Sequence, residues 1–315
     1  MAELDLDELR GRLARAGVGD VHPLAGGASS LTFAAAMGGR PVVVKVAPPG
    51  VEAIGHRDVL RQARVIKALA ESDFPVPAVV WEDPGSPPLF VMSRIDGECV
   101  EPLFDGCPPD ADLADRYRNA CRVMAALHRL SPAALGLGDE PVVDPAAEVR
   151  RWCDTLGTVD PALVPGWQDV RDALLGCAPE VMGPSVIHGD FRLGNLMAAG
   201  ARIDAVIDWE IWSIGDPRID AGWFLINCDP DTYRRVSRGD VAPPVAELTA
   251  IYRDRLGREV GDLDWFTALA CFKSAATWSL IVKHNRRRRS PRADLEAMAA
   301  ALPRLLQRAR TILGR

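Results

Sequence analysis

The stretch Val186-Ile187-His188-Gly189-Asp190-Phe191-Arg192-Leu193-Gly194-Asn195-Leu196-Met197 carries most of the information about the fold of this chain. An apolar strand ends in His-Gly-Asp, an asparagine follows the aspartate at a spacing of five, and a second apolar pair closes the loop. Further along, the apolar run Ala205-Val206-Ile207 ends abruptly in Asp208-Trp209-Glu210. Carboxylate and amide oxygens at the mouths of short strands suit a hard cation such as Mg²⁺.

This arrangement of residues is also what phosphoryl transfer requires. One aspartate orients the attacking hydroxyl and accepts its proton, while an asparagine and a second aspartate hold the metal on the nucleotide phosphates. The competing interpretation is a structural turn stabilised by hydrogen bonds of Asp and Asn side chains. Several positions agree in order and strand context, which favours the chemical interpretation.

The pattern His188-Gly-Asp190-xxxx-Asn195, followed by Ile207-Asp208-Trp-Glu210, resembles the aminoglycoside phosphotransferase/choline kinase family. The resemblance runs from about His22 to the last helices. It is nearest the bacterial branch related to the kinase-like domain of acyl-CoA dehydrogenase fusions. It implies a protein-kinase-like α+β fold, with a small β-rich, nucleotide-binding N-lobe at residues 1–96. A large, mainly helical C-lobe at residues 97–315 would hold the catalytic loop, the metal site and the substrate-binding helices.

The resemblance also implies roles for individual residues. Asp190 would be the catalytic base, and Asn195 and Asp208 the Mg²⁺ ligands, with ATP as phosphoryl donor. His188 would be a structural residue of the catalytic loop. Arg192 either approaches the transferred phosphate or an anionic substrate, or forms a salt bridge within the loop.

Lys45 interrupts the β-branched run of residues 42–46. Taken alone, such a lysine is an edge residue that points to solvent. With the downstream motif, it resembles the lysine that contacts the α- and β-phosphates. The family pairs this lysine with a glutamate on the next helix, but the aligned residue here is Gln62, which supplies no counter-charge. Glu52 and Glu71 are alternative partners.

Two further segments are candidates for nucleotide binding. The glycine pair of residues 24–30 lets backbone N–H groups approach phosphate oxygens, although an ordinary hairpin has the same signature. Residues 92–94 would form the hinge whose backbone meets adenine. The candidates in these segments are Gly26, Gly27, Ser29, Ser30, Met92, Ser93 and Arg94.

Two more polar residues have structural interpretations. Asp220 follows Gly215-Asp216-Pro217 and opens an apolar helix, so it is either the N-cap of that helix or, as in the family, a brace for the catalytic loop. His128 is expected to be a buried structural histidine rather than a catalytic one.

Periodicity predicts the secondary structure outside the motifs. Helices are expected at 5–16, 56–70, 110–130, 244–256, 265–284 and 292–312. Strands are expected at 30–36, 41–47, 78–81 and 89–92, with a strand–loop–strand block between 184 and 207.

Composition and charge exclude several classes of function. The 315 residues are 48% hydrophobic and 25% charged, with mean hydropathy +0.01, as in soluble globular proteins. The net charge of −6 argues against binding of nucleic acid. No run of about eighteen apolar residues predicts a membrane span, and the acidic start is unlike an export signal, so a cytoplasmic location is expected. The seven scattered cysteines and the absence of HExxH predict neither disulfides nor a zinc site.

The charge is divided unevenly along the chain. Residues from 211 onward carry 18 Lys and Arg against 12 Asp and Glu, a net of +6, which leaves −12 for residues 1–210. A basic substrate region favours a neutral, apolar or anionic hydroxyl compound, such as a hydroxy acid or its CoA thioester, over a polycationic drug. The alternatives are an aminoglycoside or macrolide antibiotic phosphotransferase and, motivated by Gln62, a catalytically silent nucleotide-binding regulator. The run Arg286–Arg289 either holds an anion or is a solvated loop.

Overall fold

The computed structural model describes residues 4–24, 30–100, 112–233 and 242–314, which fall into two compact units. Unit 1 comprises Met1–Val100, Ala133–Asp139 and Gly194–Trp212. Unit 2 comprises Glu101–Pro132, Glu140–Leu193 and Ser213–Arg315. The predicted lobes divide the chain at a single point, whereas these units interleave, and unit 1 takes up the segment that carries Asn195 and Asp208.

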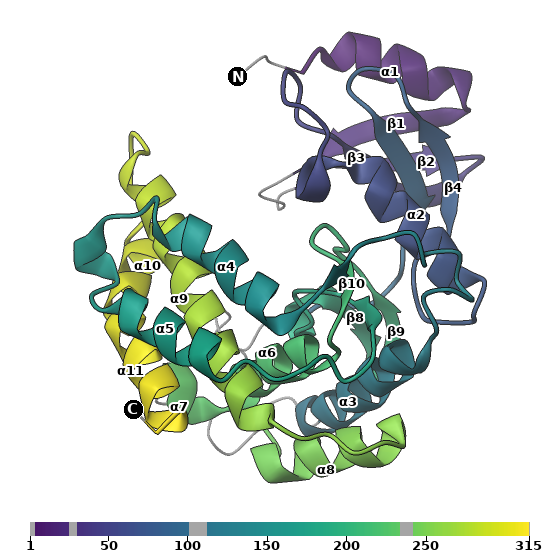
Figure 1. Cartoon of the computed structure of the whole chain (residues 1–315). Coiled ribbons are helices and arrows are strands. Elements are labelled where there is room, and N and C mark those ends of the chain that lie inside the picture. The colour runs from purple at the N-terminus through teal and green to yellow at the C-terminus, as the bar shows by residue number, and fades with distance from the viewer. Residues whose placement is uncertain (1–3, 25–29, 101–111, 234–241, 315) are drawn as a thin grey trace. The chain divides into compact units, whose positions relative to one another are not determined.

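Unit 1 is built on an antiparallel sheet in the order β1-β2-β3-β5-β4 (Figure 1). The strands are β1 (Val18–Pro23), β2 (Leu31–Met37), β3 (Arg40–Val46), β4 (Val79–Asp83) and β5 (Leu89–Ser93). The unit also contains α1 (Leu6–Arg15), a 3₁₀ turn (Gly55–Arg57), α2 (Val59–Ala70) and the hairpin of β8 (Leu196–Ala199) with β9 (Arg202–Val206).

Strand β3 shows how the sequence shapes this sheet. Val42, Val44 and Val46 are buried in the apolar cluster that also contains Leu9 and Leu13 of α1. Because side chains alternate along a strand, Val43 and Lys45 point to the opposite face. The alternative in which Lys45 is an edge residue that points to solvent does not hold, since β3 lies between β2 and β5 and the lysine is buried.

Unit 2 is mainly helical. Its helices are α3 (Leu113–Arg129), α4 (Pro145–Leu156), α5 (Trp167–Gly176), α6 (Arg218–Cys228), α7 (Pro230–Tyr233), α8 (Val245–Leu256), α9 (Leu263–Arg286), α10 (Ala293–Glu296) and α11 (Leu302–Ile312). Short 3₁₀ turns span Pro161–Leu163, Leu193–Asn195, at the junction with unit 1, and Ala297–Ala301. A small sheet joins β6 (Val142–Val143), β10 (Ser213–Gly215) and β7 (Ser185–Ile187) in that order.

Helix α9 is the central helix of unit 2, and α4, α5, α6 and α11 pack against it (Figure 1). By length and composition it is the one helix among the described residues that passes a test for a membrane span. However, 72% of its most apolar window is buried inside the protein, which is the pattern of a core helix. The apolar residues of α9 therefore serve the core of unit 2, together with residues such as Trp152, Leu174 and Leu305.

The structure differs from the predicted elements at several places, and α4, α5 and α7 fall outside the helix ranges that periodicity predicted. Strand β1 was not expected because its sequence, VGDVHP, lacks an apolar run; its pairing with β2 forms it. Strands β6 and β10 are too short to leave a periodic signal. The single helix expected at 292–312 is broken into α10, a 3₁₀ turn and α11. Pro303 lies in the first turn of α11, where a residue without an N–H is tolerated, and it cannot continue a helix from before.

Candidate active site

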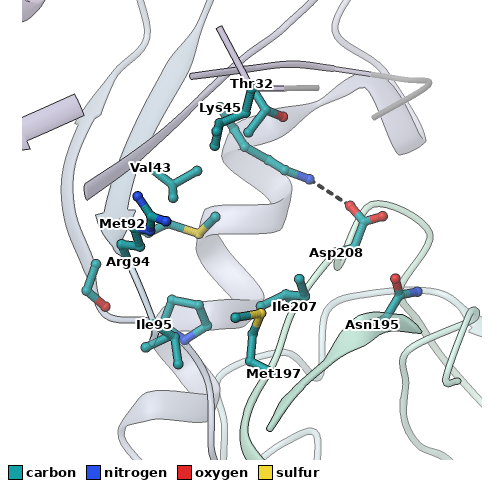
Figure 2. A pocket seen from close by; sticks show the side chains of 13 residues that line it. Thr32, Val43, Lys45, Met92, Arg94, Ile95, Asn195, Met197, Ile207 and Asp208 are labelled. Carbon is teal, nitrogen blue, oxygen red and sulfur yellow. Dashed lines mark hydrogen bonds and ion pairs between the residues drawn. The ribbon is translucent and has the colours of Figure 1, made fainter. Parts of the chain in front are cut away.

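A cavity of about 290 Å³ lies in unit 1 and gathers many of the predicted nucleotide-binding residues (Figure 2). Residues 92–94, the predicted hinge, contribute side chains to it, and so do Asn195 and Asp208, the predicted metal ligands. Its lining residues are Leu24, Thr32, Val43, Lys45, Pro77, Met92, Ser93, Arg94, Ile95, Asn195, Met197, Ile207 and Asp208. Apolar side chains from β3, β5 and the β8–β9 hairpin thus face a small set of polar groups, as in binding sites for small ligands.

The hairpin of β8 and β9 brings Asn195 and Asp208 to the same cavity. The two residues flank the hairpin, and Leu196 pairs with Val206 across it. The backbone N–H of Ile207 donates to the carbonyl oxygen of Asn195 at 3.0 Å, which ties the two ends together. Asp208 has a φ of +67°, a left-handed conformation that costs a non-glycine residue about 1–2 kcal/mol. The hydrogen-bonded hairpin holds this conformation in place.

Lys45 and Asp208 form an ion pair in this cavity, with 2.7 Å between Nζ and Oδ1 (Figure 2). The lysine side chain is 9% exposed and the aspartate 33%. Such a charge-assisted hydrogen bond in a sheltered site is stronger than an exposed pair. If a cation bound Asp208 and an anion bound Lys45, each of the two side chains would again be paired with an opposite charge.

Gln62, one of the candidate partners of Lys45, is not joined to it in the described structure, where Lys45 pairs with Asp208. It lies on α2 with 1% exposure, and its Nε2 has no hydrogen-bond partner among the described residues. Glu52 and Glu71 are exposed, and no contact joins either to Lys45 in the described structure. Asp208 supplies the negative charge that the glutamate of the family pattern would have supplied.

Replacing Gln62 by methionine is therefore expected to be harmless or stabilising. An unpaired buried donor costs about 1–3 kcal/mol, so Q62M should raise the free energy of unfolding by up to that amount. Nucleotide affinity should stay within about twofold, whereas K45M, which removes a charge-assisted contact worth about 1.5–3 kcal/mol, should lower it by about tenfold or more. Urea unfolding and calorimetric titration with ADP measure both quantities. A loss of ADP affinity in Q62M equal to that in K45M would restore Gln62 as the anchor.

The other predicted nucleotide contacts lie in part outside the described residues. Gly26, Gly27 and Ser29 belong to the segment that the structure does not describe. Ser30 is buried at the start of β2, and its hydroxyl has no partner among the described residues. Ser93 Oγ accepts a hydrogen bond from the backbone N–H of Ala78 at 2.9 Å and so fixes the end of β5.

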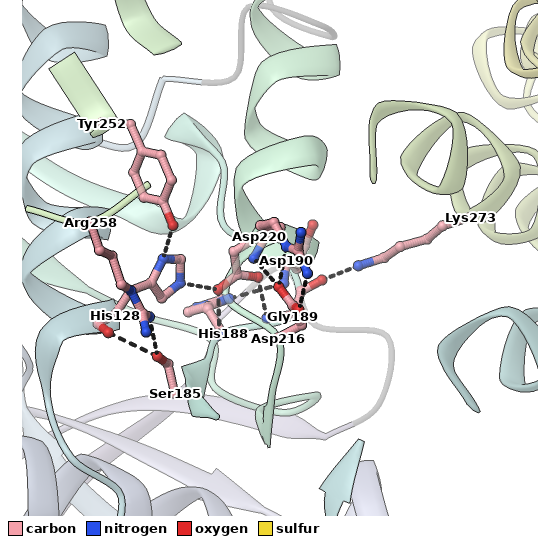
Figure 3. Close-up of polar contacts among 11 residues, drawn as sticks. His128, Ser185, His188, Gly189, Asp190, Asp216, Asp220, Tyr252, Arg258 and Lys273 are labelled. Carbon is pink, nitrogen blue, oxygen red and sulfur yellow. Dashed lines mark hydrogen bonds and ion pairs between the residues drawn. The ribbon is translucent and has the colours of Figure 1, made fainter. Parts of the chain in front are cut away.

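Asp190, the predicted catalytic base, lies in unit 2 just after β7 (Figure 3). Arg192 Nε donates to both of its carboxylate oxygens at 3.2 and 3.1 Å, so the predicted salt bridge within the loop is present. The indole Nε1–H of Trp223 donates to Asp190 Oδ1 at 2.8 Å. His188 is fully buried, and its Nδ1 accepts the backbone N–H of Asp190 at 3.1 Å. His188 is thus positioned as a structural residue.

Asp220 supports the backbone of this loop. It is not the N-cap of α6, which is Pro217. Its Oδ2 accepts the backbone N–H of His188 at 2.7 Å, and its Oδ1 accepts that of Gly189 at 2.8 Å. Burial acts to raise the pKa of this carboxyl, but hydrogen bonds and electrostatic interactions with His128 and His188 hold the pKa below its ordinary value.

A buried chain of hydrogen bonds continues from Asp220 to α8. His128 Nε2 lies 3.3 Å from Asp220 Oδ2, and His128 Nδ1 lies 2.9 Å from the hydroxyl of Tyr252. These distances fit the tautomer in which Nε2 carries the proton and Nδ1 accepts from tyrosine. His128 is therefore structural, as its sequence context indicated.

Sequence reasoning missed two residues beside Asp190. No sequence pattern marked Trp223 as a hydrogen-bond donor to Asp190. Lys273 lies in the middle of α9, and its Nζ donates to the carbonyl oxygen of Gly189 (Figure 3). A lone lysine inside an apolar helix was the available signal.

Gly222 permits the approach of α6 to α9, because a Cβ there would lie 2.4 Å from the carbonyl oxygen of Phe266.

The donor set of the cavity fits Mg²⁺. Asn195 and Asp208 present an amide and a carboxylate oxygen, and Mg²⁺ bound by few protein ligands completes its coordination with water and phosphate oxygens. Among the described residues no group of three or more His, Cys, Asp or Glu side chains forms a site for a metal bound by protein alone.

Comparison with known proteins identifies the family. A model described as the phosphotransferase enzyme family matches residues 20–263. The chain belongs to this family. The resemblance to this family that the sequence motifs indicated is confirmed.

Relatives of this phosphotransferase-family chain include parts of longer proteins. Acyl-CoA dehydrogenase family member 11 of Homo sapiens is 28% identical over 267 residues, which is 79% of this chain and 34% of that protein. Acyl-CoA dehydrogenase family member 10 of Mus musculus is 25% identical over 278 residues, 82% of this chain and 26% of that protein. The chain thus spans about a third or less of the length of these relatives.

Solved structures show the same fold. A Ralstonia eutropha protein provisionally named aminoglycoside phosphotransferase has a TM-score of 0.80 at 24% identity, covering 99% of both chains. The macrolide 2′-phosphotransferase of Brachybacterium faecium has a TM-score of 0.62 at 22% identity, covering 94% of this chain and 98% of its own. The aminoglycoside phosphotransferase APH(4)-Ia, in complex with ADP and hygromycin B, has a TM-score of 0.64 at 18% identity, covering 97% and 99%. The predicted kinase-like α+β fold is confirmed.

Proposed function

We propose that the protein transfers the γ-phosphoryl group of ATP, in a Mg²⁺-dependent reaction, to a hydroxyl group of a small molecule. The observation that carries this proposal is the cavity that Lys45, Asn195 and Asp208 line together in a chain of the phosphotransferase family. The complexes of APH(4)-Ia with ADP or AMP-PNP and hygromycin B support an adenine nucleotide as donor.

Within the cavity, each polar residue has a defined task. Lys45 would contact the phosphate oxygens of the nucleotide in place of Asp208, and Asp208 and Asn195 would hold the metal. Bound Mg²⁺ supplies positive charge that offsets the charge on the transferring phosphoryl group. The exchange keeps every charge paired, because a cation and an anion enter the site together.

Asp190 accepts the proton of the acceptor hydroxyl. Its Oδ1 is held by Trp223 and both oxygens contact Arg192 Nε, so the orientation of the carboxylate is defined before an acceptor binds. A base held in this way contributes about 10²–10⁴-fold to the rate. The transfer is direct, from ATP to the hydroxyl, without a phosphoenzyme.

The acceptor is neutral or anionic. The guanidinium of Arg192 is in contact with the Asp190 carboxylate and places a positive charge beside it. Residues from 211 onward carry a net charge of +6. A hydroxy acid or its CoA thioester suits these surroundings better than a polycationic aminoglycoside, such as the hygromycin B bound to APH(4)-Ia.

A phosphorylation screen tests the acceptor class. With labelled ATP and Mg²⁺, hydroxy acids and hydroxyacyl thioesters should be turned over with kcat/KM about 10²-fold or more above aminoglycosides, because like charges brought together cost several kcal/mol. Macrolides and neutral amino alcohols complete the panel. Faster turnover of an aminoglycoside would refute the charge argument. Tight ATP binding with no turnover of any acceptor would favour the silent nucleotide-binding regulator.

A further inference from the structure

Lys273 is buried in the apolar interior of unit 2, where a charged side chain loses its hydration at a high cost in free energy. It sits in the middle of α9 between Phe272 and Ser274, is 2% exposed, and belongs to the apolar interior of unit 2. Burying an ammonium group is strongly unfavourable unless hydrogen bonds and charges compensate for the lost hydration. Among the described residues, the carbonyl oxygen of Gly189 is its hydrogen-bond acceptor (Figure 3).

We propose that Lys273 is a positioning residue for phosphoryl transfer, which holds the Gly189–Asp190 peptide so that the Asp190 carboxylate is correctly placed. This inference rests on the proposed function for its consequence on rate, but the contacts that carry it lie wholly within unit 2.

Both ends of that peptide are bound. Its carbonyl oxygen, from Gly189, accepts a hydrogen bond from Lys273 Nζ, and its N–H, from Asp190, donates to His188 Nδ1 at 3.1 Å. The preceding N–H groups, of His188 and Gly189, donate to Asp220. A rotation of this peptide plane would break both contacts and change the ψ of Gly189 and the φ of Asp190, the residue whose carboxylate must be positioned.

The conformation at Gly189 makes such support necessary. Its φ is +86°, in the left-handed region, and glycine adopts positive and negative φ about equally readily. Glycine therefore permits the turn but does not enforce it. Asp220 fixes the N–H side of the turn, and Lys273 fixes the carbonyl side.

Lys273 also supports the side chain of Asp190 through Trp223. Its Nζ lies 4.3 Å from the centre of the Trp223 ring and 5.4 Å from that of Trp152. The edge of the Trp223 indole donates to Asp190 Oδ1 at 2.8 Å, and the Trp152 indole donates to Glu148 Oε1 at 2.7 Å. The ammonium thus contacts the indole that orients the carboxylate as well as the peptide before it.

The contact does not depend on the charge of the lysine. Burial lowers the pKa of Lys273, against the opposing effects of Glu148, Asp190 and Asp220, while Arg151 adds to the lowering. A neutral amine still donates an N–H to a carbonyl oxygen. The support of Gly189 is therefore present in both protonation states.

The test compares K273M and K273R with K283M. Lys283 is a matched control, because it is on the same helix and its Nζ also donates to a backbone carbonyl, that of Thr158 at 2.7 Å, but at an exposed site. Methionine removes the donor from position 273 and keeps an unbranched chain, while arginine keeps a donor. The measurements are kcat, KM for ATP, the urea midpoint, and hydrogen exchange of the peptide that contains residues 188–192.

In K273M, kcat should fall by about 10–10²-fold, as expected for a misplaced reacting group, while KM for ATP stays within about twofold. Exchange at the 188–192 peptide should accelerate by about tenfold or more, and the urea midpoint should not fall, because an apolar side chain replaces a buried charge. K273R should recover part of kcat and of the protection from exchange. K283M should match the wild type in all four measurements.

Two results would overturn the proposal. One is that K273M behaves like K283M in kcat and exchange. The other is that its kcat falls only in proportion to a loss of folded protein seen in urea, which is the result of a merely structural role. If the wild type turns over no acceptor, the proposed function fails separately, and exchange at residues 188–192 decides the role of Lys273 without reference to activity.

Discussion

Replacing Asp190 by asparagine is expected to lower kcat by about 10²–10⁴-fold, the range that a positioned general base contributes. The amide oxygen of D190N can still accept the hydrogen bond of Trp223, which now ends on Asp190 Oδ1. It cannot take up the proton of the acceptor hydroxyl. Asp190 does not line the cavity that Lys45 and Asp208 line, so under the proposed function the Kd for ADP should stay within about twofold. Steady-state kinetics and calorimetric titration measure the two effects.

D204N is the matched control for D190N. Asp204, on β9, is also paired with an arginine two residues away, and Arg202 Nε lies 2.6 Å from its Oδ1. Surface pairs of this kind contribute about 0–1 kcal/mol, so D204N should keep its activity. If D190N retained more than about a tenth of wild-type kcat, Asp190 would not be the general base.

Replacing Asp220 by asparagine is expected to lower the free energy of unfolding by about 3–5 kcal/mol, the cost of breaking a buried charged network. The two carboxylate oxygens of Asp220 accept different backbone N–H groups, from His188 and Gly189. Asparagine has one oxygen, so its NH₂ group would face one of these donors. The brace of the catalytic loop would be lost together with stability, and urea unfolding at neutral pH measures the loss.

The effect of D220N should depend on pH in a defined direction. The pKa of Asp220 is below its ordinary value in the folded protein, so its carboxylate stabilises the fold above the unfolded pKa of about 3.9. This stabilisation is lost as the pH falls through the folded pKa. The difference in unfolding free energy between wild type and D220N should therefore be constant from about pH 5 to 7 and shrink below about pH 4.

D58N provides the contrast to D220N. Asp58 also accepts two backbone N–H groups, of Leu60 and Arg61, but both hydrogen bonds end on the same oxygen, Oδ1. Asparagine caps a helix as well as aspartate does, so D58N should change stability by less than about 0.5 kcal/mol. Equal losses in D58N and D220N would mean that charge alone, and not the use of two oxygens, explains the effect.

Local patterns accounted for most elements near the site. The apolar runs before His188 and Asp208 predicted the ends of β7 and β9, because a short apolar run that stops at polar residues is typical of a buried strand that ends there. The Asp58 cap explains why α2 begins at Val59, three residues after the predicted start. Strand β1 escaped prediction because its hydrogen bonds to β2, not its own composition, make it a strand.

Motif order alone pointed to the phosphotransferase family and to Asp190, Asn195 and Asp208, since these residues stand at fixed spacings along one short segment. Their partners followed from the fold. Lys45 is paired with Asp208, 163 residues away, and not with Gln62.

The same holds for the two residues that orient Asp190. Lys273 reaches Gly189 over 84 residues, and Trp223 reaches Asp190 over 33. A hydrogen bond depends on distances of about 3 Å between atoms, and no periodicity or spacing in the sequence encodes such distances across a fold. The candidate functional residues could therefore be predicted from the sequence of one short segment. The contacts that hold these residues and their charges in place depend on the packing of β3, α6 and α9, which only the tertiary structure shows.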